Sequence, residues 1–253
     1  MQRVIVRGAK KYLEQMKNLW RDTFGDTDEF IDLFFEKFYR PRKTFLMLEG
    51  SALVSMLFFM DVKVKYDGKR VRAAYLYGVA TKLSERRQGH FTALHNALLE
   101  ELTSKKYDLI ITIPQNDSLF SFYKETGYTL PLRRCEFSLH TLDLMPVEDP
   151  HEVWLLKKEL HKKARSGFSL LESEEQFLET VRDHKLFRYD GGYLAFYPKN
   201  DGYVLYGIIS DDPSHAPVEL VHYERSALMR DITGKLDYDR IDKEKPVLAF
   251  LMS

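Results

Sequence analysis

The alternation of apolar and polar residues along the chain predicts an α+β protein. Residues 1–7 alternate with period two, as a half-buried strand does. Residues 10–24 and 26–38 repeat their apolar residues at helical spacing, and Gly25 separates them. Residues 44–81 then predict three strands joined by tight turns. The N-terminal half therefore opens as a strand, two helices and an antiparallel meander.

The stretch after the third of these strands has the features of an anion site. Residues 73–81 predict a buried strand, and Leu recurs at helical spacing over residues 93–102. Arg86, Arg87 and Gly89 stand just before this helix, where the first backbone N–H groups lack intrahelical partners and the helix dipole is positive. Gly89 lets a phosphate approach the backbone closely. Taken alone, the turn is weak evidence for an anion site, because basic turns before helices are common and are usually solvated.

A second segment continues the pattern. Residues 105–114 predict another buried strand, parallel to residues 73–81 because a helix intervenes, so both strands leave the sheet near the same end. Asn116 follows, and Asp117 or Ser118 is expected to cap a short helix. Gly127 is expected to close that helix with a positive φ.

These two segments together resemble the GCN5-related N-acetyltransferase (GNAT) family. Residues 86–91 resemble its central motif, in which Arg or Gln, two residues, Gly and one residue precede Gly or Ala. Phe91 departs from that motif, because the family usually has a small residue there. Asn116, followed by Phe122-Tyr123 and then Gly127, resembles the second motif of the family. Two motifs in the expected order are much more specific than either alone.

The resemblance implies a mixed, mostly antiparallel sheet with one parallel strand pair splayed at a cofactor cleft, and acetyl-CoA as cosubstrate. The pantetheine arm would pair with the backbone of residues 79–81 as an added strand would. The helix start would hold the diphosphate, and Asn116 the arm from the other side. The expected cofactor-binding residues are Val79, Ala80, Thr81, Arg86, Arg87, Gln88, Gly89, His90, Phe91, Thr92 and Asn116.

The resemblance also assigns the general acid to Tyr123, whose phenol can donate a proton to the leaving thiolate. The alternative is that Tyr123 is a core aromatic residue like Phe122. A backbone N–H of residue 80 or 81 could polarise the thioester carbonyl. Three candidates for the general base stay open: Glu49, the C-terminal carboxylate of Ser253, or water beside Tyr77.

The C-terminal half predicts a degenerate second copy of the fold. Residues 151–165 and 172–184 predict helices, residues 189–210 a hairpin and residues 216–232 a further helix. The Pro-bounded joint at 145–150 places the boundary between domains 1–145 and 146–253. Residues 211–217 form an acidic loop, so no second cofactor site is expected. This arrangement resembles the enhanced intracellular survival branch without its carrier-like domain, and in that branch the chain terminus returns to the active site.

Composition excludes several classes of protein. Lys and Arg together number 38, as do Asp and Glu, so a nucleic-acid partner is disfavoured. Cys135 is the single cysteine, which rules out an internal disulfide and suits a reducing compartment. The sequence has neither an apolar run of spanning length nor a signal-like N-terminus, so a cytoplasmic protein without membrane association is expected. The histidines lack metal-ligand spacing, and no metal is expected.

The favoured hypothesis is an acetyl-CoA-dependent N-acetyltransferase acting on a primary amine of a small molecule or a peptide. The alternatives are a non-catalytic acyl-CoA sensor on the same fold and a transferase with another acyl donor. The sequence does not identify the acceptor. Asp26, Asp28, Glu29 and Glu49 could attract a cationic amine or could be solvated helix-start charges, and the aromatic face of residues 30–38 could be core or acceptor wall. A homo-oligomer is compatible with exposed aromatics on the second unit.

Overall fold

The computed structural model describes residues 2–66, 68–139, 144–163, 168–199, 202–210 and 218–233. It divides into two compact units, each described by itself below. Unit 1 comprises Met1–Val62, Arg72–Phe122 and Met229–Lys235, and unit 2 comprises Lys63–Val71, Tyr123–Leu228 and Leu236–Ser253. The predicted boundary between residues 145 and 146 stays a prediction.

A large mixed sheet runs in the order β1-β2-β3-β4-β5-β12-β6, and β8 pairs with β3. Its strands are β1 (Arg3–Arg7), β2 (Thr44–Glu49), β3 (Ala52–Tyr66), β4 (Lys69–Thr81), β5 (Leu109–Thr112), β6 (Leu130–Leu139), β8 (Phe168–Leu171) and β12 (Val218–Asp231). The pairs β1–β2, β2–β3 and β3–β8 are antiparallel, whereas β4 and β5 are parallel. The predicted mixed sheet with a parallel pair is confirmed.

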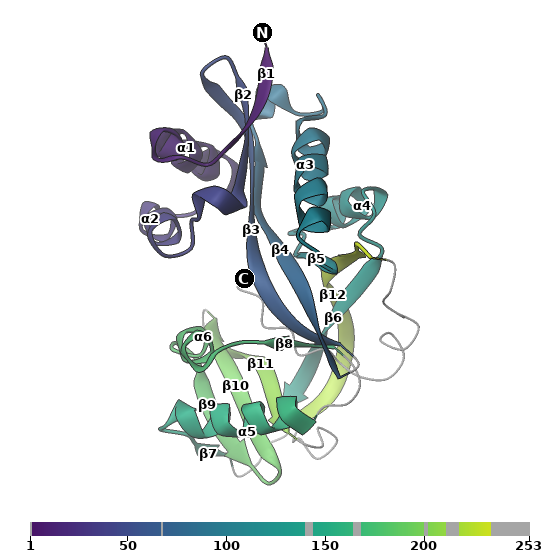
Figure 1. Cartoon of the computed structure of the whole chain (residues 1–253). Coiled ribbons are helices and arrows are strands. Elements are labelled where there is room, and N and C mark those ends of the chain that lie inside the picture. The colour runs from purple at the N-terminus through teal and green to yellow at the C-terminus, as the bar shows by residue number, and fades with distance from the viewer. Residues whose placement is uncertain are drawn as a thin grey trace. The chain divides into compact units, whose positions relative to one another are not determined.

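Helices cover both faces of the sheet in unit 1. Helices α1 (Leu13–Phe24) and α2 (Asp28–Lys37) lie on one face, and α3 (His90–Ser104) lies on the other (Figure 1). Gly25 ends α1 in the left-handed conformation with φ 72°. The Thr27 side chain then caps α2 by accepting a hydrogen bond from the Phe30 N–H at 3.3 Å. The chain can therefore turn sharply between the two helices.

Trp20 is the centre of the core beneath α1 and α2. It is 1% exposed, and its ring lies 4.4 Å from that of Phe34 and 5.8 Å from that of Phe58, between centroids. Ile31 and Phe35 are also buried, but Phe30 is 42% exposed. The predicted aromatic face is therefore mainly core. The prediction is wrong for Phe30, which lies at a solvent-facing position of α2.

Unit 2 contains a second, antiparallel sheet in the order β11-β10-β9-β7. Its strands are β7 (Met145–Pro146), β9 (Lys185–Tyr189), β10 (Gly192–Lys199) and β11 (Gly202–Ser210), and its helices are α5 (Pro150–Lys163) and α6 (Glu174–Thr180). Trp154 of α5 and Phe177 of α6 share a buried cluster with residues of β9, β10 and β11. The predicted capping box of Ser173 and Gln176 opens α6.

One predicted helix of the second unit is wrong. Residues 216–232 were expected to be helical, but Val218–Asp231 form strand β12. This strand lies between β5 and β6 in the sheet, so hydrogen bonds to segments distant in the sequence determine its conformation. The order of elements on which the degenerate second copy was predicted therefore lacks its last helix. The residue pattern also did not predict the short strands β8 and β9.

Among the helices in the described ranges, none combines the length and apolarity that crossing a lipid bilayer requires. The acidic loop at residues 211–217 and the chain terminus, which was expected to return to the active site, lie outside the described residues.

Candidate active site

Strand β4 continues beyond its parallel partner. The register of β4 with β5 ends at Leu76 opposite Thr112, and the Thr112 Oγ1 hydroxyl donates to the Leu76 carbonyl at 3.5 Å. Strand β4 then runs on through Val79 to Thr81. The last residues of β4 therefore present a backbone edge that has no β5 partner in the described register. An extended amide-bearing chain could pair with this edge.

Contacts to β3 show which backbone groups face that edge. The Ser55 hydroxyl donates to the Ala80 carbonyl at 2.9 Å, and the Lys82 N–H donates to the Val54 carbonyl at 2.9 Å. Residues 80 and 82 thus direct backbone groups toward β3. Because backbone direction alternates along a strand, Val79 and Thr81 direct theirs toward the β5 side.

Gly78 lies two residues after Leu76, the last position at which β4 pairs with β5. Its φ is 56°, in the left-handed region. A Cβ at this position would lie 2.7 Å from Trp20 Cζ3 and 2.7 Å from Phe58 Cδ2. Only glycine can adopt this φ without strain and also leave room for the rings of Trp20 and Phe58. Packing in the core under α1 therefore requires glycine at this position of β4.

The loop after β4 leads into α3 through two left-handed residues. A 3-10 turn covers Leu83–Glu85, and Arg87 and Gly89 have φ values of 62° and 78°. The first hydrogen bond of α3 runs from the Ala93 N–H to the Gly89 carbonyl at 3.0 Å. The N–H groups of residues 90–92 precede that bond and form the positive end of the helix dipole. A Cβ on Gly89 would meet nothing within 4 Å, so the approach is open.

Several side chains of this loop are held by neighbours within unit 1. Arg86 Nε donates to the Thr81 carbonyl at 3.3 Å. The Gln88 amide donates to Glu85 Oε2 at 3.1 Å and accepts from Arg3. These bonds fix the loop against the end of β4, which leaves the backbone as its main anion-binding element.

The His90 side chain is buried and only 3% exposed. Its Nε2 lies 3.6 Å from Glu85 Oε2 and has no hydrogen-bond partner within the described residues. His90 would therefore contact a diphosphate through its backbone N–H rather than through its ring. Thr92, in contrast, lies at an exposed position of the first turn.

Phe91 places its ring along α3 rather than over the helix start. The ring stacks on His95, one turn further into the helix, with 5.1 Å between centroids and 19° between planes. It also meets the Phe122 ring edge-on at 4.9 Å. The departure from the family motif at this position is therefore accommodated by aromatic packing between α3 and α4 (Asp117–Glu125).

Asn116 caps α4, which corrects the expectation of a cap at Asp117 or Ser118. Its Oδ1 accepts from the Leu119 N–H at 3.0 Å and from the Ser118 hydroxyl at 2.7 Å. The residue is exposed. With Oδ1 engaged, a contact of Asn116 with a pantetheine arm would use the Nδ2 amide group.

Tyr123 and Phe122 are neighbours on α4 with opposite exposure. Tyr123 is 6% exposed, and its ring lies 5.4 Å from that of Tyr128; both tyrosines belong to unit 2. Phe122 is 38% exposed. Consecutive helical residues cannot both face inward, and here Tyr123 is the buried one. Burial is compatible with either the acid role or a core role.

The candidates for the general base have different surroundings. Glu49, at the end of β2, lies 3.6 Å from Arg3 Nε. Burial and then the charge of Asp26 raise the pKa of Tyr77 to about 12, so Tyr77 stays protonated and can only relay through water. The third candidate, the carboxylate of Ser253, lies outside the described residues. Cys135, which is not a candidate base, lies in strand β6.

His95 is excluded as a base near neutral pH. Burial, and then the charge of Arg230, lower its pKa from 6.5 to about 4. It is 3% exposed and lies in the buried face of α3.

The shift of His95 predicts acid destabilisation. Between pH 6.5 and about 4, the unfolded chain binds a proton at this histidine and the folded chain does not, so folded stability falls as pH falls through this window. We expect His95→Gln to flatten the decline of the urea midpoint between pH 6.5 and 4.5. His151→Gln, an exposed histidine, serves as control. An unchanged slope in His95→Gln would contradict the assignment.

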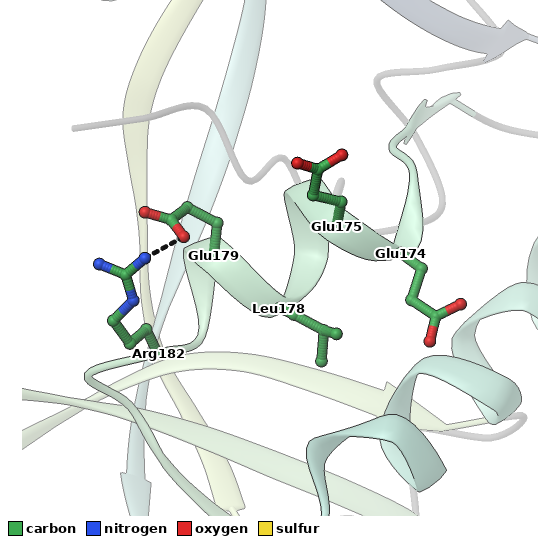
Figure 2. A pocket seen from close by; sticks show the side chains of 5 residues that line it. All are labelled: Glu174, Glu175, Leu178, Glu179 and Arg182. Atoms are coloured by element: carbon green, nitrogen blue, oxygen red, sulfur yellow. Dashed lines mark hydrogen bonds and ion pairs between the residues drawn. The ribbon is translucent and has the colours of Figure 1, made fainter. Parts of the chain in front are cut away.

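The structure also has an open depression beside α6, and none of the residues that line it is a predicted site residue. Figure 2 shows its lining, Glu174, Glu175, Leu178, Glu179 and Arg182, with Arg182 paired to Glu179. Three carboxylates and one paired arginine disfavour a phosphate ligand. Within the described residues there is also no group of three or more His, Cys, Asp or Glu side chains that could hold a metal ion.

Comparisons with known proteins place the chain in a family. Residues 5–130 match the family model described as an acetyltransferase (GNAT) domain. A GCN5-related N-acetyltransferase from Kribbella flavida has a TM-score of 0.72 at 15% identity, covering 91% of this chain and 72% of that one. A probable N-acyltransferase from Enterococcus faecalis V583 has a TM-score of 0.71 at 14% identity, covering 92% and 73%.

Eis1 from Mycobacterium abscessus is also similar in fold, with a TM-score of 0.66 at 11% identity, covering 91% of this chain and 74% of that one. At these identities the structures show a shared fold alone. No curated protein matches the sequence. The predicted fold class is thus confirmed by both the family model and the solved structures.

Proposed function

This chain belongs to the GNAT superfamily through its acetyltransferase domain at residues 5–130, and from that premise we propose that it transfers an acetyl group from acetyl-CoA to a primary amine. GNAT enzymes use acyl-CoA as the donor. The observation that carries the proposal is the unpaired edge of β4 beyond Leu76, which leads directly into the exposed helix start after Gly89.

Each part of CoA has a chemically suitable partner on this connection. The amides of the pantetheine arm pair with the backbone of Val79 and Thr81, as an added strand. The diphosphate accepts hydrogen bonds from the N–H groups of residues 90–92, with Arg86 and Arg87 supplying positive charge. The thioester then lies along the open edge, oriented for attack.

The reaction forms one C–N bond and breaks one C–S bond. The amine attacks the thioester carbonyl, whose oxygen accepts from a backbone N–H at the open edge. The tetrahedral intermediate expels the thiolate, which takes the proton of the Tyr123 phenol, and the amine loses a proton to the base. Orientation of an already activated thioester supplies much of the rate.

Asp26 is the acidic residue that best fits recognition of a cationic acceptor. It is half-buried and accepts from Trp20 Nε1 at 2.7 Å, whereas Asp28 is paired with Arg21 and Glu49 with Arg3. Its charge also contributes to the raised pKa of Tyr77. We propose that Asp26, among the rings of Trp20 and Tyr77, attracts the ammonium group.

Asp26→Asn is expected to raise KM for the amine about tenfold and to leave the affinity for CoA unchanged. Asparagine keeps an oxygen that can accept from Trp20 Nε1 but removes the charge. Steady-state kinetics with acetyl-CoA at saturation measures the effect, and Asp28→Asn is the matched control. Equal changes in both variants would argue against a specific role of Asp26.

The experiment that tests the proposed function is incubation of the protein with acetyl-CoA and a panel of amines, including polyamines, aminoglycosides and peptides. Release of free thiol is followed, and the acetylated product is identified by mass spectrometry. Calorimetry with CoA runs in parallel. Binding of CoA without turnover of any amine would favour the sensor alternative, and absence of CoA binding would reject both.

A further inference from the structure

Two phenylalanine rings beside the start of α3 have no part in the reaction described above. Phe91 is the second residue of α3, and Phe122 lies on α4; both belong to unit 1. Their ring centroids are 4.9 Å apart with 61° between planes. Phe122 is 38% exposed, so part of its ring is accessible to solvent. We call this pair the aromatic platform.

The platform is backed by a fixed, uncharged side chain. The Phe91 ring stacks on His95, which is 3% exposed. Because burial lowers the pKa of His95 to about 4, its imidazole is uncharged at neutral pH. The ring of Phe91 is therefore held in one orientation by His95 and Phe122, and such preorganisation lowers the entropic cost of stacking a ligand on it.

The platform is covalently linked to the proposed diphosphate site. The N–H of Phe91 is one of the three that precede the first hydrogen bond of α3, so one residue supplies both a diphosphate donor and a ring. In CoA a single ribose separates the diphosphate from adenine. A base that follows a diphosphate bound at this helix start therefore lies within reach of the aromatic platform.

We propose that the aromatic platform of Phe91 and Phe122 stacks the adenine of CoA. This inference rests on the proposed function. Every base has a π-face, and base-on-aromatic stacking contributes substantially to binding. The consequence is a donor preference: the protein uses acyl groups on free CoA and discriminates against donors that carry 4′-phosphopantetheine without adenosine, such as acyl carrier proteins.

The test compares three probes by calorimetry: CoA, adenosine 3′,5′-bisphosphate and 4′-phosphopantetheine. Phe122→Ala is expected to weaken the binding of CoA and of adenosine 3′,5′-bisphosphate by about five- to 150-fold, the range that base stacking provides. Its affinity for 4′-phosphopantetheine is expected to stay within about twofold of wild type. Phe122→Trp, which keeps a stacking face, should restore the affinity for both nucleotides.

Leu83→Ala is the matched control, since Leu83 is an apolar residue that is 79% exposed in the same connection between β4 and α3. It should leave all three affinities unchanged. If Phe122→Ala weakened the binding of all three probes equally, or of none, the proposal that the platform stacks adenine would be wrong. A wild-type protein that fails to bind CoA would instead reject the proposed function, and the platform with it.

Discussion

Tyr123→Phe is expected to lower kcat by about 10²- to 10³-fold, because it removes the proposed donor of the proton that the leaving thiolate needs. The affinity for CoA should change little, since the substitution removes only the hydroxyl of a side chain that is 6% exposed. Single-turnover kinetics of acetyl transfer and calorimetry with CoA measure the two quantities separately. A separation of rate from affinity identifies an acid and is not expected of a core residue.

Tyr107→Phe is the matched control for this change. Tyr107 is 5% exposed and donates its hydroxyl proton to Asp61, so the same atom is removed from a buried tyrosine that the proposed reaction does not use. It should lower stability without lowering kcat. If Tyr123→Phe retains full kcat, the acid role is wrong and Tyr123 is a core residue. If the wild-type protein has no turnover, the sensor alternative is favoured.

Gly78→Ala is expected to lower the free energy of unfolding of unit 1 by about 3 kcal/mol, from left-handed strain and from overpacking together. The new Cβ would lie 2.7 Å from the rings of Trp20 and Phe58, at a residue whose φ is 56°. Urea denaturation followed by fluorescence measures the loss. In a Trp154→Phe background, Trp20 is the single tryptophan and reports on unit 1.

Gly25→Ala separates the two contributions. Gly25 has a φ of 72°, but a Cβ there would meet nothing within 4 Å. This variant should therefore lose only about 1 kcal/mol, the cost of the left-handed conformation alone. Similar losses in both variants would mean that the rings of Trp20 and Phe58 relax around a Cβ at residue 78.

The sequence determined those parts of the protein that local physical chemistry specifies. Helix α1 with its end at Gly25 and the capping box of α6 follow from residue spacing and from side-chain groups a few residues away. For α2 the sequence left the cap open between Asp26 and Thr27, and the structure has Thr27. The parallel pairing of β4 with β5 followed from the helix between them. The loop of residues 86–89 was predicted as an anion site from its resemblance to the central family motif, followed by the second motif, because a basic turn before a helix is weak evidence by itself.

Only the tertiary structure decided features that depend on partners distant in the sequence. Residues 218–231 have both helical and strand character, and their place between β5 and β6 made them β12. The burial of His90 and the exposure of Phe122 follow from packing in unit 1, which residue spacing does not reveal. Hydrogen bonds and side-chain burial in a fold are shared between segments that meet only after the chain has folded, so a local pattern cannot assign them.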